Sequence, residues 1–161
     1  MLLIGGCNFA NCAIYCLLVV MSRVVLVTGA GGYIGAHIVE QLLKDPQNLV
    51  RGTVRKLSQK EKYAHLLEFE GAAERLTLVE ADLNEVGSFD KAMEGVEVCM
   101  HVASPYVIDV KDPQRDLVDP AVKGTVTVLE SCVKAGTVKQ VILTSSCAAI
   151  ADGAHPIFYL P

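Results

Sequence analysis

The chain has 161 residues, of which 52% are hydrophobic and 20% charged, and this composition excludes disordered and fibrous proteins. It carries 14 Lys and Arg against 18 Asp and Glu, a net charge of −4, which argues against a nucleic-acid-binding protein because such proteins are usually basic. The length is that of one domain with a core of useful size.

The first part of the chain is apolar, and residues 1–22 contain no charged side chain. A run of about 20 apolar residues can cross a bilayer, so association with a membrane through residues 1–21 is an alternative. Glycines and asparagines interrupt the run, no basic segment precedes it, and a strand begins at Arg23 without a linker. We therefore expect an extension outside the domain of residues 23–161, with Met21 as an alternative start, in a cytoplasmic protein.

Short β-branched runs alternate with segments of helical periodicity from Arg23 onward. Strands are predicted at 23–28, 49–54, 76–80, 96–102 and 138–143. Helical segments are predicted from residue 34 to about 45, over 58–70, around 89–93 and over about 114–135. This alternation predicts right-handed βαβ crossovers, and therefore an α/β fold: a doubly wound parallel sheet with helices on both faces.

Two helical segments have a predicted buried face. In 58–70 this face contains Tyr63, Leu66 and Leu67. In the long helix, which we expect to end near Gly136, the apolar stripe contains Leu117, Ala121, Val122, Thr125, Val128, Leu129, Cys132 and Val133. The strand that follows is apolar, and as an uncovered edge it would invite association.

The six cysteines contain no C-x-x-C motif. Cys99, Cys132 and Cys147 fall inside apolar runs, so we expect buried free thiols in a reducing compartment. Cys12 and Cys16 have a spacing that metal ligands can have, but no partner motif accompanies them, and no metal site is predicted.

The stretch TGAGGYIG (28–35) joins the first predicted strand to the first predicted helix. In such a turn, Gly29 permits the tight bend, Gly32 lets the backbone approach a pyrophosphate, and Gly35 permits close packing of helix on strand. The start of the helix offers free N–H groups and the positive end of its dipole to phosphates. The turn lacks the Gly-Lys-Ser/Thr of a nucleotide-triphosphate loop, so it predicts a dinucleotide site rather than phosphate transfer.

The end of the second strand usually selects the dinucleotide. An acidic residue there would bind the ribose 2′-hydroxyl of NAD, but this chain has Arg55 in the sequence GTVRK. A guanidinium can bind a 2′-phosphate through two hydrogen bonds, so NADP (NADPH) is favoured over NAD. A solvated surface arginine is the alternative interpretation of Arg55.

Taken together, these segments resemble the N-terminal part of an extended short-chain dehydrogenase/reductase of the NAD-dependent epimerase/dehydratase superfamily. They are most similar to the dihydroflavonol 4-reductase-like branch, which neighbours the 3-beta-hydroxysteroid dehydrogenases. The resemblance runs from about Val24 to Ile150. The segments that show the resemblance are TGAGGYIG (28–35), GTVRKLSQKEK (52–62), ADL (81–83), SFDKAMEGVEVCMHVASP (88–105), DPAVKGTVTVLESC (119–132) and VKQVILTSS (138–146).

The resemblance implies hydride transfer between NADP and a small-molecule carbonyl or alcohol, with roles for named residues. Gly29, Gly32 and Gly35, with the backbone of Tyr33 and Ile34, would hold the pyrophosphate; Arg55 and Lys62 would face the 2′-phosphate; Asp82 and Leu83 would lie against the adenine; Val102, Ala103 and Ser104 would line the nicotinamide-side ribose; Ser146 would be the catalytic serine. Other interpretations stay open. Asp82 can cap a helix beginning near residue 85, Ser146 can be a strand-end hydrogen-bonding residue, and His101 is expected to be a core histidine.

In this family a tyrosine protonates the substrate oxygen, and a lysine four residues later lowers the pKa of that tyrosine. Tyr159 is the only tyrosine after Ser146, and the chain ends at Pro161, before a matching lysine. We therefore expect the cofactor-binding half of an enzyme, incomplete at its C-terminus. The alternatives are a nucleotide-sugar epimerase or dehydratase and a non-catalytic dinucleotide-binding fragment. Family members often dimerise through helices flanking this core, so the resemblance also implies a homodimer through the helix at 114–135.

Overall fold

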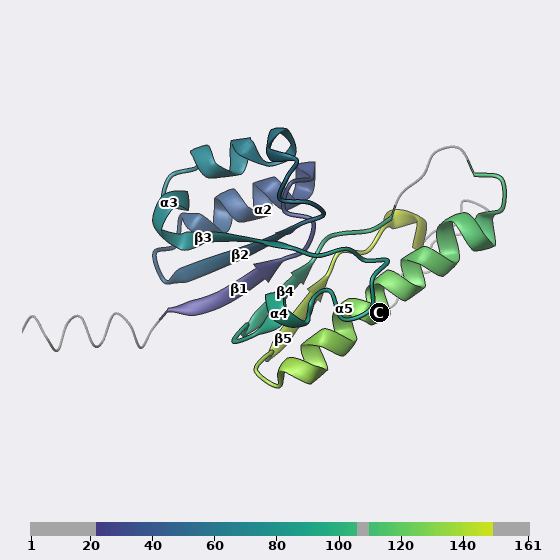
Figure 1. Cartoon of the computed structure of the whole chain (residues 1–161). Coiled ribbons are helices and arrows are strands. Elements are labelled where there is room, and N and C mark those ends of the chain that lie inside the picture. The colour runs from purple at the N-terminus through teal and green to yellow at the C-terminus, as the bar shows by residue number, and fades with distance from the viewer. Residues whose placement is uncertain (1–21, 106–109, 150–161) are drawn as a thin grey trace, which may run out of the picture.

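A five-stranded parallel sheet forms the centre of the computed structural model, which describes residues 22–105 and 110–149 (Figure 1). The strands are β1 (Arg23–Val27), β2 (Asn48–Val54), β3 (Leu76–Glu80), β4 (Val98–His101) and β5 (Gln140–Leu143). Their order is β3-β2-β1-β4-β5, and all neighbours are parallel. The chain moves outward from β1 in one direction and then in the other, which confirms the predicted doubly wound fold and places its switch point between β1 and β4.

Helices cover both faces of this sheet. Among the described residues, the α-helices are α2 (Tyr33–Leu43), α3 (Ala72–Arg75), α4 (Asp90–Met93) and α5 (Asp119–Ala135). Figure 1 shows α2 and α3 on one side of the sheet and α4 and α5 on the other. Shorter turns of helix lie at Lys60–Lys62, Ala64–Glu68, Gln114–Val118 and Cys147–Ala149.

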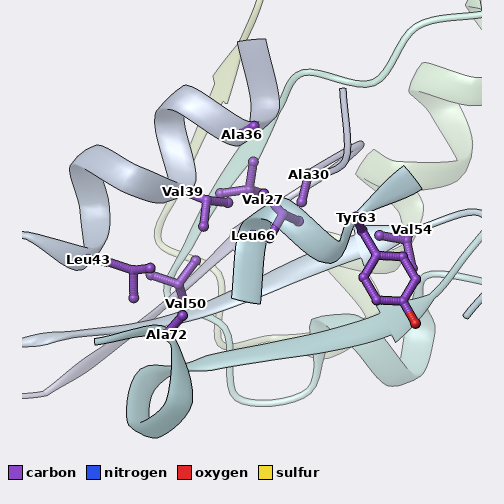
Figure 2. Packing of buried hydrophobic residues seen from close by; sticks show 10 residues of the cluster. All are labelled: Val27, Ala30, Ala36, Val39, Leu43, Val50, Val54, Tyr63, Leu66 and Ala72. Carbon is purple, nitrogen blue, oxygen red and sulfur yellow. The ribbon is translucent and has the colours of Figure 1, made fainter. Parts of the chain in front are cut away.

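The two hydrophobic clusters follow from the alternation of side chains along the strands. On β1, Val27 belongs to the cluster under α2, whereas its neighbour Leu26 belongs to the cluster under α4 and α5. Figure 2 shows the first cluster, in which Val39 of α2 lies beside Val27 of β1 and Leu43 of α2 lies beside Val50 of β2. Both faces of the central strand are therefore buried, as a parallel sheet requires.

The predicted helix over 58–70 is wrong as a continuous element. The structure has two 3-10 turns there, Lys60–Lys62 and Ala64–Glu68. Tyr63 and Leu66 are buried as predicted, but Leu67 is 55% exposed. In a 3-10 turn, residues three apart share a face, so Tyr63 and Leu66 align and Leu67 points elsewhere.

The predicted stripe of the long helix is wrong in part. Val128 and Cys132 are buried as predicted, but the other buried residues of α5 are small or polar, whereas the predicted Val122, Leu129 and Val133 are exposed. Four apolar side chains of α5 point to solvent: Val122, Val126, Leu129 and Val133. The helix ends at the predicted place, because Gly136 takes a left-handed conformation with φ of 67°.

The cysteines of the described segments are unpaired. Cys99 and Cys132 are buried, but Cys147 is exposed, so the expectation of burial is wrong for this residue. A hydrogen bond with Cys132 and burial raise the pKa of the Cys99 thiol. Cys12 and Cys16 lie outside the described residues, as does the apolar stretch at 1–21. Within 22–105 and 110–149, no helix combines the length and apolar character needed to cross a bilayer.

Candidate functional site

A cavity of about 660 Å³ opens where four parallel strands end. It is lined by the residues that directly follow β1, the last residues of β2, and the segments after β3 and β4. Ligands in doubly wound folds bind in this crevice, outside the carboxyl ends of the strands at the switch point. The lining includes every predicted site residue except Lys62 and Ser146: Gly29, Gly32, Tyr33, Ile34, Gly35, Arg55, Asp82, Leu83, Val102, Ala103 and Ser104.

The turn after β1 is shaped by its glycines. Gly29 has a left-handed conformation with φ of 66°, and a β-carbon there would lie 3.1 Å from the Ala103 Cβ. A β-carbon on Gly35 would lie 2.3 Å from the Gly29 carbonyl oxygen, so α2 packs onto the turn only because Gly35 has no side chain. The Gly29 amide also donates to the Thr53 hydroxyl at 3.2 Å, which joins the turn to β2.

The start of α2 is open toward the cavity. Gly32 precedes the helix, no side chain caps this end, and the first turn contains no acidic residue. Tyr33, Ile34 and Gly35 form this first turn and line the cavity. Free amides at the positive end of a helix dipole are suited to a phosphate group, so the glycine turn fits a pyrophosphate.

The Thr28 hydroxyl organises the opposite wall of the cavity. Its oxygen accepts hydrogen bonds from the Val102 and Ala103 amides, both at 2.9 Å, and lies 2.9 Å from the His101 Nδ1. Because the two amides occupy the oxygen lone pairs, the hydroxyl proton is donated to Nδ1. His101 is therefore neutral, in agreement with burial, which lowers the pKa of this side chain.

The sequence identified His101 as a core histidine, and this is confirmed, since it is 2% exposed. The sequence did not identify Thr28 or Thr53 as contributors. The signal that marks both is a threonine at the end of a strand that borders the glycine turn. Their hydroxyls bond to backbone amides across neighbouring strands, and these bonds set the relative positions of the cavity walls.

Arg55 and Asp82 face each other at the far end of the cavity. The Arg55 Nε lies 3.9 Å from the Asp82 Oδ2, and the Arg55 side chain is 76% exposed. The other oxygen of Asp82 accepts from the Asn84 amide at 2.9 Å. The capping alternative for Asp82 is wrong, because residues 82–85 form a turn and the next helix begins at Asp90.

Lys62 lines a second cavity, of about 260 Å³, that adjoins the glycine turn. The same cavity is lined by Arg55, Lys56 and Gln59, so the two cations predicted to face a 2′-phosphate lie in one place. The sequence did not single out Lys56 or Gln59. In this part of the described chain, no acidic side chain lines the cavity, which is suited to an anion.

The remaining predicted site residue is Ser146. It follows β5 and is exposed, and it is not among the residues that line either cavity. Its carbonyl oxygen accepts from the Ala149 amide at 3.0 Å in the short turn that follows. Tyr159 lies outside the described residues. The catalytic role of Ser146 therefore stays a prediction.

Comparison with known proteins gives the relatives of this chain. The family model described as the 3-beta hydroxysteroid dehydrogenase/isomerase family matches residues 26–158. Cinnamoyl-CoA reductase CAD2 of Medicago truncatula is 47% identical over 136 residues, which are 84% of this chain and 41% of that protein. Dihydroflavonol 4-reductase of Callistephus chinensis is 43% identical over 126 residues, 78% of this chain and 34% of that protein. The resemblance predicted from the sequence is confirmed.

Solved structures agree with this relationship. Yeast methylglyoxal/isovaleraldehyde reductase Gre2 complexed with NADPH aligns with a TM-score of 0.70 at 34% identity, over 80% of this chain and 39% of that one. Vestitone reductase from alfalfa aligns with a TM-score of 0.64 at 33% identity, over 79% of this chain and 37% of that one. The chain therefore spans about two fifths of the length of the proteins that it matches.

Proposed function

The chain belongs to the 3-beta hydroxysteroid dehydrogenase/isomerase family, and from this premise we propose that it is the cofactor-binding part of an NADP-dependent oxidoreductase acting on CH–OH/C=O groups. The cavity at the ends of four parallel strands carries the proposal, because it has an open helix start on one side and Arg55 on the other. Relatives named as reductases, one of them solved with NADPH, support the same assignment.

When bound, NADPH would supply a hydride to a small-molecule carbonyl. The residues of this chain would hold and orient the dinucleotide. The amides of Tyr33, Ile34 and Gly35 would bind the pyrophosphate, and Arg55 and Lys62 would bind the 2′-phosphate. Asp82 and Leu83 would lie against the adenine, and Val102, Ala103 and Ser104 against the other ribose. Ser146 would hydrogen-bond the substrate oxygen.

Two alternatives have different support. A nucleotide-sugar epimerase or dehydratase is disfavoured by Arg55, because an acidic residue near that position would suit NAD. A non-catalytic dinucleotide-binding module has one observation in its favour, namely that Ser146 does not line the cavity. Turnover separates it from the reductase: the module binds NADPH without oxidising it when carbonyl compounds are added.

We also propose the domain bounds, the cellular location and the partners that the sequence predicts. The domain comprises residues 23–161, with residues 1–22 as an extension, and the protein is cytoplasmic. Its partners are a small-molecule carbonyl or alcohol and a second copy of the chain, and it binds neither nucleic acid nor metal.

The assignment to NADP predicts the effect of Arg55→Asp. The substitution removes a cation and places a carboxylate where the 2′-phosphate would bind, so we expect NADPH binding to weaken at least about tenfold. NADH lacks this phosphate, and its affinity should change little. The measurement is a fluorescence titration of both dinucleotides into the 161-residue chain.

Lys44→Asp is the matched control, because it makes the same charge change at the opposite end of α2 from the cavity. It should leave the ratio of the two affinities unchanged. Equal losses for NADPH and NADH in Arg55→Asp would refute the assignment to NADP. A well-folded chain with no affinity for either dinucleotide would refute the proposed function altogether.

A further inference from the structure

Leu57 lies within the basic loop (residues 55–62). Its backbone amide and its backbone carbonyl each form a hydrogen bond with a side chain. Its amide donates to the Glu80 Oε2 at 2.8 Å, and its carbonyl oxygen accepts from the Tyr63 hydroxyl at 2.7 Å. Glu80 is the last residue of β3, and Tyr63 directly follows the loop. The centre of the loop is therefore tied both to the sheet and to the core.

Tyr63 is itself held firmly. Its side chain is 6% exposed and belongs to the cluster that contains Val54 and Leu66. Figure 2 shows the ring beside Val54, with the hydroxyl oxygen directed away from the other residues of the cluster. The burial of the ring fixes the position of the hydroxyl, so the hydroxyl is a rigid donor for the Leu57 carbonyl.

The end of the basic loop rests on the glycine turn. A β-carbon on Gly31 would lie 3.0 Å from the Lys62 carbonyl oxygen and 3.7 Å from the Tyr63 Cβ. This close approach packs the backbone of Lys62 directly against the turn before α2. The loop that carries the cations and the turn suited to a pyrophosphate are thus parts of one packed unit.

Backbone hydrogen bonds complete the shape of the loop on either side of Leu57. The Gln59 amide donates to the Lys56 carbonyl at 3.2 Å, and the Lys62 amide donates to the Gln59 carbonyl at 3.1 Å. These short turns bring Arg55, Lys56 and Lys62 to the wall of the 260 Å³ cavity. The three cations that line this cavity repel one another, so the loop needs attachments to keep this arrangement before an anion binds.

The Glu80 carboxylate lies close to a site suited to an anion. Its hydrogen bond with the Leu57 amide explains why a negative charge at this position is compatible with that site. Its Oε2 accepts the Leu57 amide hydrogen, and Glu80 does not line the cavity. The carboxylate therefore acts on the loop through the backbone. An acid that faced the 2′-position would instead favour NAD.

We propose that Tyr63 and Glu80 are positioning residues that determine the preference for the 2′-phosphorylated dinucleotide, by fixing Leu57 and with it the shape of the basic loop. This inference rests on the proposed function. Glu80 does not line the 260 Å³ cavity, whereas Tyr63 does, with its hydroxyl donated to the Leu57 carbonyl. Each side chain would act through Leu57 on Arg55 and Lys62.

The test is a titration of NADPH and NADH into the 161-residue chain and its variants Tyr63→Phe and Glu80→Ala. Tyr63→Phe keeps the buried ring and removes only the hydroxyl. Loss of one such hydrogen bond should weaken NADPH binding roughly five- to tenfold, while NADH binding stays within about twofold. Glu80→Ala removes the acceptor of the Leu57 amide hydrogen bond and should also weaken NADPH binding more than NADH binding.

Glu80→Gln separates positioning from simple charge. The amide oxygen of glutamine can still accept from the Leu57 amide. If Glu80 acts by positioning Leu57, the ratio of the NADPH affinity to the NADH affinity in Glu80→Gln should therefore stay near that of the wild type. If Glu80 acted only through its negative charge, both Glu80→Gln and Glu80→Ala would strengthen NADPH binding. That result would overturn the inference.

Ser131→Ala is the control for a general loss of stability. It removes a buried hydroxyl that donates to the Asp90 Oδ1 at 2.7 Å, on the other face of the sheet, and should leave the ratio unchanged. Hydrogen exchange gives a readout without cofactor: the Leu57 amide should exchange faster in Glu80→Ala than in Glu80→Gln.

The outcomes are distinguishable. A wild-type chain that prefers NADPH, with variants that keep the same preference, overturns this inference and leaves the proposed function standing. A folded wild-type chain that binds neither dinucleotide overturns both.

Discussion

The Thr28 hydroxyl shows what a single residue contributes to this site and why the sequence did not reveal it. It bonds to His101, Val102 and Ala103, which lie 73 to 75 residues away along the chain. Gly29 and Gly35 were predictable because their roles depend on a local turn. The contacts of the Thr28 and Tyr63 hydroxyls depend on which segments become neighbours in the fold. Hydropathy patterns do not predict which backbone groups a single hydroxyl will contact.

The neutral state of His101 predicts a pH dependence of stability. Burial lowers the pKa of His101 in the folded chain, whereas the unfolded chain has the ordinary value of about 6.5. The unfolded state therefore binds the proton more readily, and the free energy of unfolding should fall as the pH drops below about 6.5. The fall should level off once the pH is below the folded-state pKa. Denaturant unfolding between pH 7.5 and pH 5 measures it.

His101→Asn is the comparison for this measurement, because an amide oxygen can accept from Thr28 but does not titrate. The difference in stability between wild type and variant isolates His101 from the carboxylates. Hydrogen bonds with Lys134 and Arg115 lower the pKa values of Asp90 and Asp116, respectively. The contribution of these two carboxylates to stability is therefore lost at a more acidic pH than the contribution of His101. A pH profile of the wild type that is parallel to that of the variant would contradict the protonation state assigned to His101.

Among the elements, α5 shows most clearly the limit of a periodic pattern. The helix and its end at Gly136 were predictable, but not the face that it buries. Small and polar residues of α5, Gly124, Thr127 and Ser131, lie on the buried face. Gly124 allows close contact with Leu83, and Ser131 donates to Asp90 of α4. The apolar stripe did not identify the whole buried face, because the contacts with Leu83 and Asp90 are made by small and polar side chains.

The packing of α2 on the glycine turn leads to a prediction for Gly35→Ala. Alanine favours a helix over glycine by about 1 kcal/mol, so propensity alone predicts a gain in stability. The new β-carbon would lie 2.3 Å from the Gly29 carbonyl oxygen, and α2 would have to move away from the turn. We expect a net loss of about 1–3 kcal/mol, measured by urea unfolding.

Gln41→Ala is the matched substitution, at an exposed position of the same helix. It changes helix propensity without a new contact and should leave the stability within about 0.5 kcal/mol of the wild type. A Gly35→Ala chain that is more stable than the wild type would show that the turn and α2 are not packed as described.

For the molecule as a whole, the parallel order of the sheet was predictable, since alternating strands and helices allow few other topologies. The surfaces left exposed were predictable only in part. The prediction of β5 as an apolar edge is confirmed for the described residues: it pairs with β4 alone, and Val141, Ile142 and Leu143 are 37%, 42% and 52% exposed. The exposed valines of α5 were not predicted, because the sequence placed Val122 and Val133 in the buried stripe.

These two surfaces predict two kinds of self-association. An unpaired strand edge can accept further strands without limit, which gives aggregates of no fixed size. The outer face of α5, made of Val122, Val126, Leu129 and Val133, can be covered by the same face of a second copy, which gives a closed dimer. Sedimentation velocity of the 161-residue chain at micromolar concentration should therefore show a dimer together with larger species.

One lysine substitution on each surface separates the two kinds. Ile142→Lys places a charge on the edge strand and should remove the larger species while the dimer remains. Val126→Lys makes the same kind of change on α5, where the valine is 44% exposed, and should remove the dimer. Because both residues are exposed, neither variant should lose more than about 0.5–1 kcal/mol of stability. A chain that stays monomeric at these concentrations would contradict both modes, and with them the homodimer that we propose.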